Sequence, residues 1–121
     1  MATLYTICLV TVGDKKTAAA ITDALLKEKL AACVSAVPGL VSTYRWKGKI
    51  EHSSEILLII KTRKALREDV MQAVRRKHPY SVPEILFLDI EKGGKDYLDW
   101  LGANTLFTTN IPKDRAENNG L

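Results

Sequence analysis

The segment from Cys33 to Thr62 constrains the fold of this chain most, because it predicts a β-hairpin with unusually long arms. Two stretches of strand composition, Cys33 to Trp46 and Ile50 to Thr62, flank a tight turn in which Gly48 can adopt a positive φ. Arms of about 14 residues extend ~45 Å at ~3.3 Å per residue. A compact domain of 121 residues is only roughly 35 Å across. We therefore expect the hairpin to protrude beyond its own domain.

The protruding part of the hairpin carries apolar side chains that a monomer would leave exposed. They are Val41, Tyr44, Trp46 and Ile50. The Pro38-Gly39 pair in the first arm favours a bulge at a sheet edge, since proline cannot donate a ladder hydrogen bond. Exposed apolar edge strands pair readily with another chain, so the sequence predicts a homo-oligomer in which hairpins extend neighbouring sheets. The alternative is a hairpin that coils back over its own sheet at Pro38-Gly39.

The rest of the chain alternates strand and helix patterns. We expect strands over Thr3 to Val12 and Glu84 to Ile90, amphipathic helices over Lys15 to Ala31 and Ala65 to Lys77, and a short helix around Tyr97 to Leu101. Asp14 is placed to cap the first helix, and the apolar run Ile56 to Ile60 predicts burial on both faces of the sheet.

This order of elements predicts the fold class. A β-α-β-β-α-β chain favours an α+β fold of the ferredoxin-like type, with both helices on one face of a four-stranded antiparallel sheet. The long hairpin protrudes from this sheet, and the short C-terminal helix follows it. We expect a single domain over residues 1–107 and a polar, flexible tail over residues 108–121.

Charge and composition exclude several classes of protein. Hydrophobic residues make up 46% of the chain, too many for a disordered protein, and the net charge is only +4. No apolar run reaches the ~18 residues of a membrane-spanning helix, and the first residues show no secretory signal. Two cysteines are too few for a disulfide scaffold. We expect a cytoplasmic protein with reduced thiols.

Several motifs spread along the chain occur together in one known family. They are Lys29-Leu30-Ala31-Ala32-Cys33-Val34, Pro38-Gly39 with Ser42, Tyr44 and Trp46, Gly48-Lys49-Ile50-Glu51, Glu55, Lys61-Thr62, His78-Pro79-Tyr80 with Pro83-Glu84, and Tyr97-Leu98 with Trp100-Leu101. In this combination the sequence resembles the CutA family of divalent-cation-tolerance proteins. The resemblance implies a ferredoxin-like protomer in a tight homotrimer built through the hairpins. It also implies tolerance of copper and other divalent metals, and a fold related to the trimeric PII signal proteins.

The resemblance further implies a copper site, which this sequence matches poorly. In metal-binding members a strand-one cysteine and two adjacent histidines are implicated, and the matching positions here are Val10 and Lys77-His78. Cys8 lies two residues earlier on the same strand face, about 6–7 Å away, and a lysine ammonium has no lone pair. We therefore expect weak or no copper binding at a site limited to His78 and Cys8. Structural roles for both residues are the alternative.

Polar and aromatic residues near the expected subunit boundaries indicate a small-molecule site. A cation, a carboxylate and aromatic walls suit such a site. We predict that six residues converge at a cleft between subunits: Lys61, His78, Tyr80, Glu84, Tyr97 and Trp100. The alternative is that Lys61 and Glu84 form a structural ion pair while the aromatic side chains pack the interface.

Sequence motifs for catalysis and for nucleic-acid binding are missing. No Gly-x-Ser-x-Gly, Walker A or Gly-x-Gly-x-x-Gly pattern occurs. The third strand carries Glu51 and Glu55 where an RNA-recognition motif needs exposed aromatic residues. We therefore predict a non-enzymatic homotrimer of the CutA type, without nucleic-acid or membrane partners, that binds a divalent metal or a small ligand weakly between subunits. The alternative is a PII-like regulatory trimer that senses a small metabolite and binds a protein partner.

Overall fold

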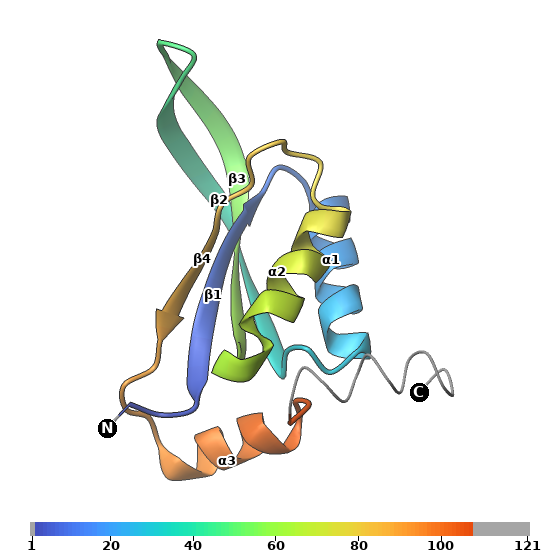
Figure 1. The fold of residues 1–121 in the computed structure, drawn as a ribbon. Coiled ribbons are helices and arrows are strands. Elements are labelled where there is room, and N and C mark those ends of the chain that lie inside the picture. Colours follow the sequence, from blue (N-terminus) through green and yellow to red (C-terminus); the bar gives the residue numbers. More distant parts are fainter. Residues whose placement is uncertain (1, 108–121) are drawn as a thin grey trace.

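The computed structural model describes residues 2–107 as a four-stranded antiparallel sheet with its two longest helices on one face and a shorter helix at one end (Figure 1). In chain order the elements are β1 (Tyr5–Val12), α1 (Lys15–Lys27), β2 (Cys33–Trp46), β3 (Lys49–Arg63), the 3₁₀ helix η1 (Lys64–Leu66), α2 (Arg67–Lys77), β4 (Ile85–Asp89) and α3 (Lys95–Ala103). The strand order across the sheet is β2-β3-β1-β4. The predicted α+β class, antiparallel sheet and element order are confirmed. The tail predicted over residues 108–121 lies outside the described residues.

The hydrophobic core lies between the sheet and the two helices α1 and α2. Strand register aligns core side chains in rows across the sheet, Ile60–Cys8–Phe87 in one row and Leu58–Val10–Ile85 in the next. From the helices, residues at helical spacing complete the core: Ala18, Ile21 and Leu25 on α1, and Val70, Ala73 and Val74 on α2. One face of the sheet therefore packs against α1 and α2 to form the core.

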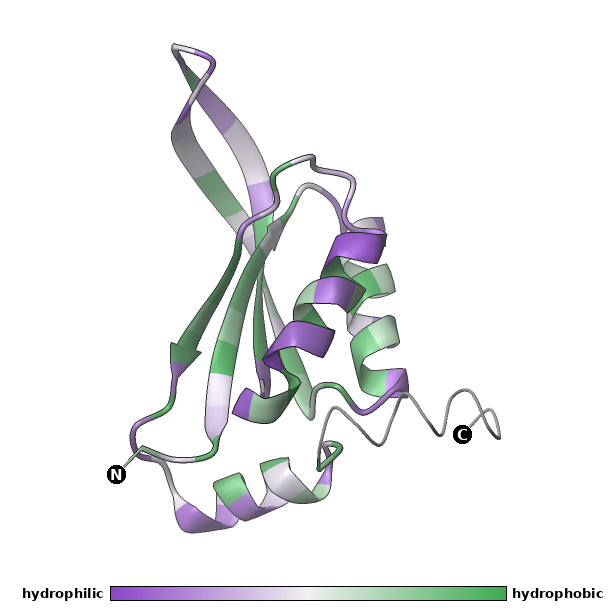
Figure 2. Cartoon of the chain, viewed as in Figure 1, coloured by the Kyte–Doolittle hydropathy of each residue, from purple (hydrophilic) through white to green (hydrophobic). Residues whose placement is uncertain are grey.

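The opposite face of the sheet carries apolar side chains, and among residues 2–107 helix α3 reaches only its end beside Tyr5 and Arg63 (Figures 1 and 2). This uncovered sheet face consists of Ile7 and Leu9 on β1, Leu57 and Ile59 on β3, and Leu86 and Leu88 on β4. Leu86 is 54% and Leu88 is 56% exposed. Within one protomer, the prediction that the run in β3 is buried on both faces does not hold for this side. Leu57 and Ile59 are only half-buried because no second layer covers them.

The hairpin of β2 and β3 extends past the body of the domain (Figure 1). At its tip Lys47 has a φ of 50° and Gly48 a φ of 80°, as a type I′ turn requires. The register of β2 shifts between Val37 and Leu40, with Gly39 at a φ of 80°. The predicted turn, bulge and edge position of β2 are confirmed. Because the hairpin projects outward, the alternative in which it coils back over its own sheet is wrong.

Helix α1 ends four residues before the predicted limit at Ala31. Its start is as predicted, since Oδ1 of Asp14 accepts the N–H of Thr17 at 2.7 Å. At its end Lys29 adopts a φ of 57°, and the N–H groups of Lys29 and Leu30 donate to the carbonyls of Leu26 and Leu25. Glycine is the usual residue at such a left-handed cap. Because lysine occupies this position, no glycine marks the end of the helix.

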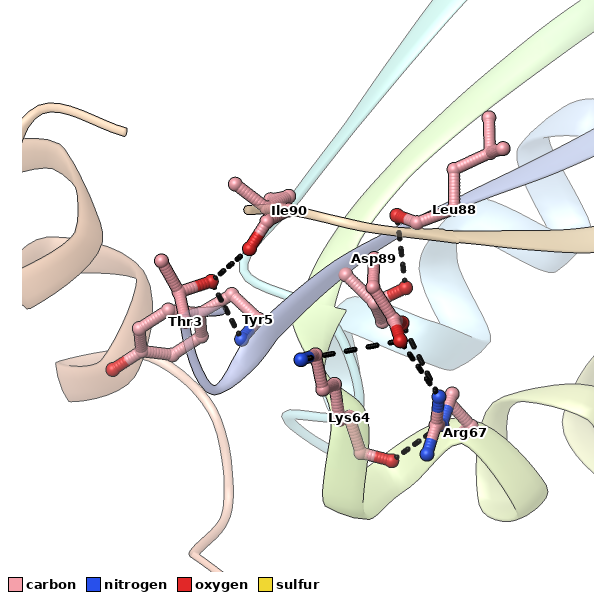
Figure 3. A network of polar contacts seen from close by, with 8 residues as sticks. Thr3, Tyr5, Lys64, Arg67, Leu88, Asp89 and Ile90 are labelled. Atoms are coloured by element: carbon pink, nitrogen blue, oxygen red, sulfur yellow. Dashed lines mark hydrogen bonds and ion pairs between the residues drawn. The ribbon is translucent and has the colours of Figure 1, made fainter. Parts of the chain in front are cut away.

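Polar contacts hold the edge strand β4 against the start of α2 (Figure 3). Nη1 of Arg67 donates to Oδ1 of Asp89 at 3.2 Å, and Nζ of Lys64 lies 3.9 Å from Oδ2 of Asp89. The hydroxyl of Thr6 on β1 donates to the Leu88 carbonyl at 3.1 Å. These contacts fix the position of β4, and with it the two exposed leucines of the uncovered sheet face.

Candidate functional site

Within one chain, the predicted ligand-binding residues form two groups at opposite ends of the sheet. Both β3 and β4 are antiparallel to β1, so they run in the same direction. Lys61 near the end of β3 and Glu84 before the start of β4 therefore lie far apart. Glu55, which neighbours Tyr80, is six residues from Lys61 on β3, about 20 Å at ~3.3 Å per residue. The six predicted residues therefore do not converge in one cleft within a protomer. Their convergence across subunits stays a prediction.

The first group lines a cavity of about 620 Å³ between the protruding arm of the hairpin and the segment that joins α2 to β4. Its walls include Tyr44 and Trp46 from β2, Glu55 from β3, and Tyr80 and Glu84 from the joining segment. This volume falls in the range of small-molecule sites. Tyr44, Trp46 and Glu55 were not among the predicted site residues. The one sequence signal for Glu55 is a carboxylate at the start of the apolar run of β3, with Leu57 next on the same strand face.

Tyr80 and Glu55 form the polar centre of this cavity. The hydroxyl of Tyr80 donates to Oε2 of Glu55 at 2.9 Å, and Glu55 is only 7% exposed. Burial, followed by this hydrogen bond to Glu55, raises the pKa of Tyr80 to about 12. Gly13 packs against the same hydroxyl, since a Cβ at this glycine would lie 3.0 Å from it. Tyr80 therefore stays protonated at neutral pH, and its hydroxyl donates a hydrogen bond to the carboxylate of Glu55.

We expect Tyr80 to be the last tyrosine to ionise as the pH rises. Its pKa of about 12 lies above the ordinary value of 10.0, so the stability it contributes is complete below pH ~10 and is lost as the pH rises through about 12. Tyrosinate absorbance against pH measures this. Tyr80→Phe removes the latest component, Glu55→Gln moves it to lower pH, and the control Tyr5→Phe keeps it. A curve that Tyr80→Phe leaves unchanged at its alkaline end would contradict the assignment.

The second group surrounds the start of β2 and the helix α3. Nζ of Lys61 donates to Oγ of Ser35 at 2.6 Å and to Sγ of Cys33 at 3.6 Å. Desolvation, followed by the nearby Cys33 thiol, raises the pKa of Tyr97. The rings of Tyr97 and Trp100 lie 5.6 Å apart and are about half exposed. Among residues 2–107 Lys61 forms no ion pair with Glu84, so that alternative is wrong within one protomer.

His78 is buried at the C-terminal end of α2, and both of its ring nitrogens have partners. Nε2 lies 2.7 Å from the carbonyl oxygen of Thr11, and Nδ1 lies 3.2 Å from the backbone nitrogen of Tyr80. Because a carbonyl only accepts and a backbone N–H only donates, these partners select the neutral ring with its proton on Nε2. The lone pair that a metal ion needs is thus already used. His78 instead positions Tyr80, whose ring centroid is 4.5 Å away.

Cys8 lies in the middle of β1 and is fully buried among core residues. Burial raises the pKa of its thiol to about 12, whereas metal ions bind the thiolate. In the described part of the chain no group of three or more His, Cys, Asp or Glu side chains is placed to hold a metal ion. These residues do not fit a metal centre. The assignment of His78 and Cys8 as ligands stays a prediction against which their contacts argue.

Comparison with known proteins identifies the family. The family described as the CutA1 divalent ion tolerance protein matches residues 6–104 of this chain. The chain belongs to the CutA1 family. The resemblance expected from the motifs is thereby confirmed across β1 to α3. The relatives named below do not support the alternative PII-like role.

Relatives in the CutA1 family are similar to this chain over most of its length. The divalent-cation tolerance protein CutA of Thermus thermophilus is 46% identical over 99 residues, which cover 82% of this chain and 96% of the relative. The chloroplastic protein CutA of Arabidopsis thaliana is 45% identical over 96 residues, which cover 79% of this chain. This chain spans only about half of that plant protein, 53% of its length.

Solved CutA1 structures have the same fold. The crystal structure of CutA1 from Oryza sativa has a TM-score of 0.84 at 39% identity, covering 88% of this chain and 98% of that one. The divalent cation tolerance protein of Thermus thermophilus has a TM-score of 0.82 at 44% identity, covering 84% and 99%. No helix within residues 2–107 is long and apolar enough to cross a membrane.

Proposed function

We propose that this CutA1-family chain acts in divalent-cation tolerance as a non-enzymatic homotrimer that binds a small ligand or a metal ion weakly at clefts between its subunits. The uncovered sheet face is the observation that carries the oligomer. Its side chains align in rows, Ile59–Leu9–Leu86 and Ile7–Leu88. Soluble monomers rarely expose contiguous apolar patches of this kind, which mark interaction sites.

The hairpin supplies a second apolar surface and a free strand edge. Val41 is 69%, Ile50 is 55% and Trp46 is 42% exposed on it. The sheet ends in β2 on one side and β4 on the other. When the hairpin of one copy packs on the far edge of the next, the contact is heterologous, and such contacts form a ring where the rotation between copies closes. A ring of three is the number that the family resemblance implies.

The ligand clefts follow from the same arrangement. The cavity beside Glu55 opens next to the protruding hairpin, where a neighbouring subunit would contribute a further wall. The contacts of His78 and Cys8 favour a small ligand over a metal ion at these clefts. We propose a cytoplasmic location, since both cysteines are free thiols.

Sedimentation equilibrium at low micromolar concentration tests the assembly. We expect a mass about three times the 13.4 kDa of one chain. A single species of one-chain mass would overturn the proposed trimer and its clefts. The tolerance role is tested in cells that lack their own CutA1 protein. There the chain is expected to restore growth at raised concentrations of divalent metal salts, and unchanged growth would contradict that role.

A further inference from the structure

We infer that the cavity beside the protruding arm of the hairpin binds a small organic cation, with Glu55 as the residue that recognises the charge. This names the ligand class of the cleft, so it deepens the proposed function. The cavity itself is lined by one chain. A neighbouring subunit would add a further wall, and ligand binding is tested separately from the number of subunits.

The first argument is the charge of the cavity. Glu55 is 7% exposed and accepts one hydrogen bond, from Tyr80. Within residues 2–107 no lysine, arginine or histidine forms an ion pair with it. A buried carboxylate without a cation is costly, so it favours a positively charged partner. Glu84 adds a second carboxylate, and no basic side chain lines the cavity. The site is acidic although the chain carries a net charge of +4.

The second argument is the chemistry of the walls. Tyr44, Trp46 and Tyr80 line the same cavity and are 41%, 42% and 38% exposed. Aromatic faces attract cations, most strongly where water is excluded. A nitrogen cation can therefore pair with the carboxylate of Glu55 while its apolar part packs on the ring of Tyr80, whose hydroxyl contacts that carboxylate. A planar guanidinium suits both contacts, because it binds carboxylates through two N–H groups and stacks on aromatic faces.

The third argument separates an organic cation from a divalent metal ion. Calcium takes six to eight oxygen ligands, and magnesium needs near-ideal octahedral geometry. The cavity offers two carboxylates, and the described residues hold no group of three metal-binding side chains. Aromatic side chains provide no ligand atoms that could replace the water molecules bound to a divalent ion. The geometry thus selects a weakly hydrated monocation.

The test compares two probes of the same shape and different charge, methylguanidine and methylurea. Binding to the protein in its solution assembly is measured by isothermal titration calorimetry. We expect methylguanidine to bind in a saturable way and methylurea at equal concentration to give no measurable binding heat. Glu55→Gln is expected to weaken methylguanidine binding at least about tenfold.

Glu84→Gln is a second variant that tests the same inference if Glu55→Gln fails to fold. Glu84 is exposed, so its substitution is expected to leave the fold intact. Glu84→Gln is expected to weaken binding about two- to fivefold, and Leu26→Lys on α1 is expected to leave it unchanged. Equal binding of the two probes, or unchanged affinity in both glutamine variants, overturns the inference. The inference is also overturned if the wild-type protein binds neither probe and Glu55→Gln changes the assembly mass. That result would mean that a basic side chain of a second copy fills the cavity. A monomeric mass with intact methylguanidine binding overturns only the trimer.

Discussion

Replacing Leu88 with lysine is expected to convert the oligomer into single chains at low micromolar concentration. Leu88 is 56% exposed on the edge strand β4 and lies beside Ile7 on the uncovered sheet face. In the proposed trimer the substitution places an unpaired ammonium in each apolar contact, which costs several kcal/mol per site. The fold is retained, because this side chain points away from the core. Sedimentation equilibrium and circular dichroism measure the two effects.

The control for this substitution is Leu26→Lys on α1. Leu26 is 42% exposed but belongs to the outer surface of a helix, far from the uncovered sheet face. It is expected to keep the mass of the wild-type assembly. If Leu88→Lys also keeps that mass, this face is not the contact between subunits, and the proposed arrangement of the trimer fails.

His78→Ala is expected to lower the free energy of unfolding by about 2–4 kcal/mol and to leave copper binding unchanged. The substitution removes a ring that is 8% exposed and leaves the Thr11 carbonyl and the Tyr80 N–H without their partners. Because both ring nitrogens are already bonded, the ring has nothing to offer a copper ion. Urea unfolding at fixed protein concentration and calorimetric titration with Cu²⁺ measure the two effects.

His52 provides the matched control, because the chain has only two histidines. His52 is exposed on the hairpin, where its Nδ1 lies 3.0 Å from the hydroxyl of Thr43. His52→Ala is expected to change stability by less than about 0.5 kcal/mol. A copper isotherm that weakens in His78→Ala alone would reinstate His78 as a metal ligand.

Much of the fold is predictable from the sequence where a nearby residue determines the local backbone. Asp14 caps α1, Gly48 forms the hairpin turn, and Pro38-Gly39 produces the bulge in β2. Each depends on chemistry within a few residues. The end of α1 is not predictable in this way. Lys29 takes a conformation that glycine usually supplies, and packing of Leu30 and Ala31 into the core compensates for it.

The candidate site is less predictable, because its residues meet only through the tertiary fold. The contact between Tyr80 and Glu55 spans 25 positions and depends on where the segment between α2 and β4 crosses the sheet. Lys61 and Glu84 were grouped because each lies near a strand end. The shared direction of β3 and β4 puts those ends on opposite sides of the molecule. Both ring nitrogens of His78 also contact backbone groups. Such contacts cannot be predicted from the order of residue types.

The central place of β1 in the sheet has a consequence for synthesis on the ribosome. Thr6 pairs with Thr62 on β3 and with Asp89 on β4. The first strand to be translated therefore cannot pair until these two later strands have been made. At about 5–20 residues per second, several seconds pass before both neighbours have emerged. During that interval the nascent chain displays an apolar segment over residues 5–12 with open backbone groups. Newly made protein is therefore most in need of a chaperone until β4 has left the exit tunnel.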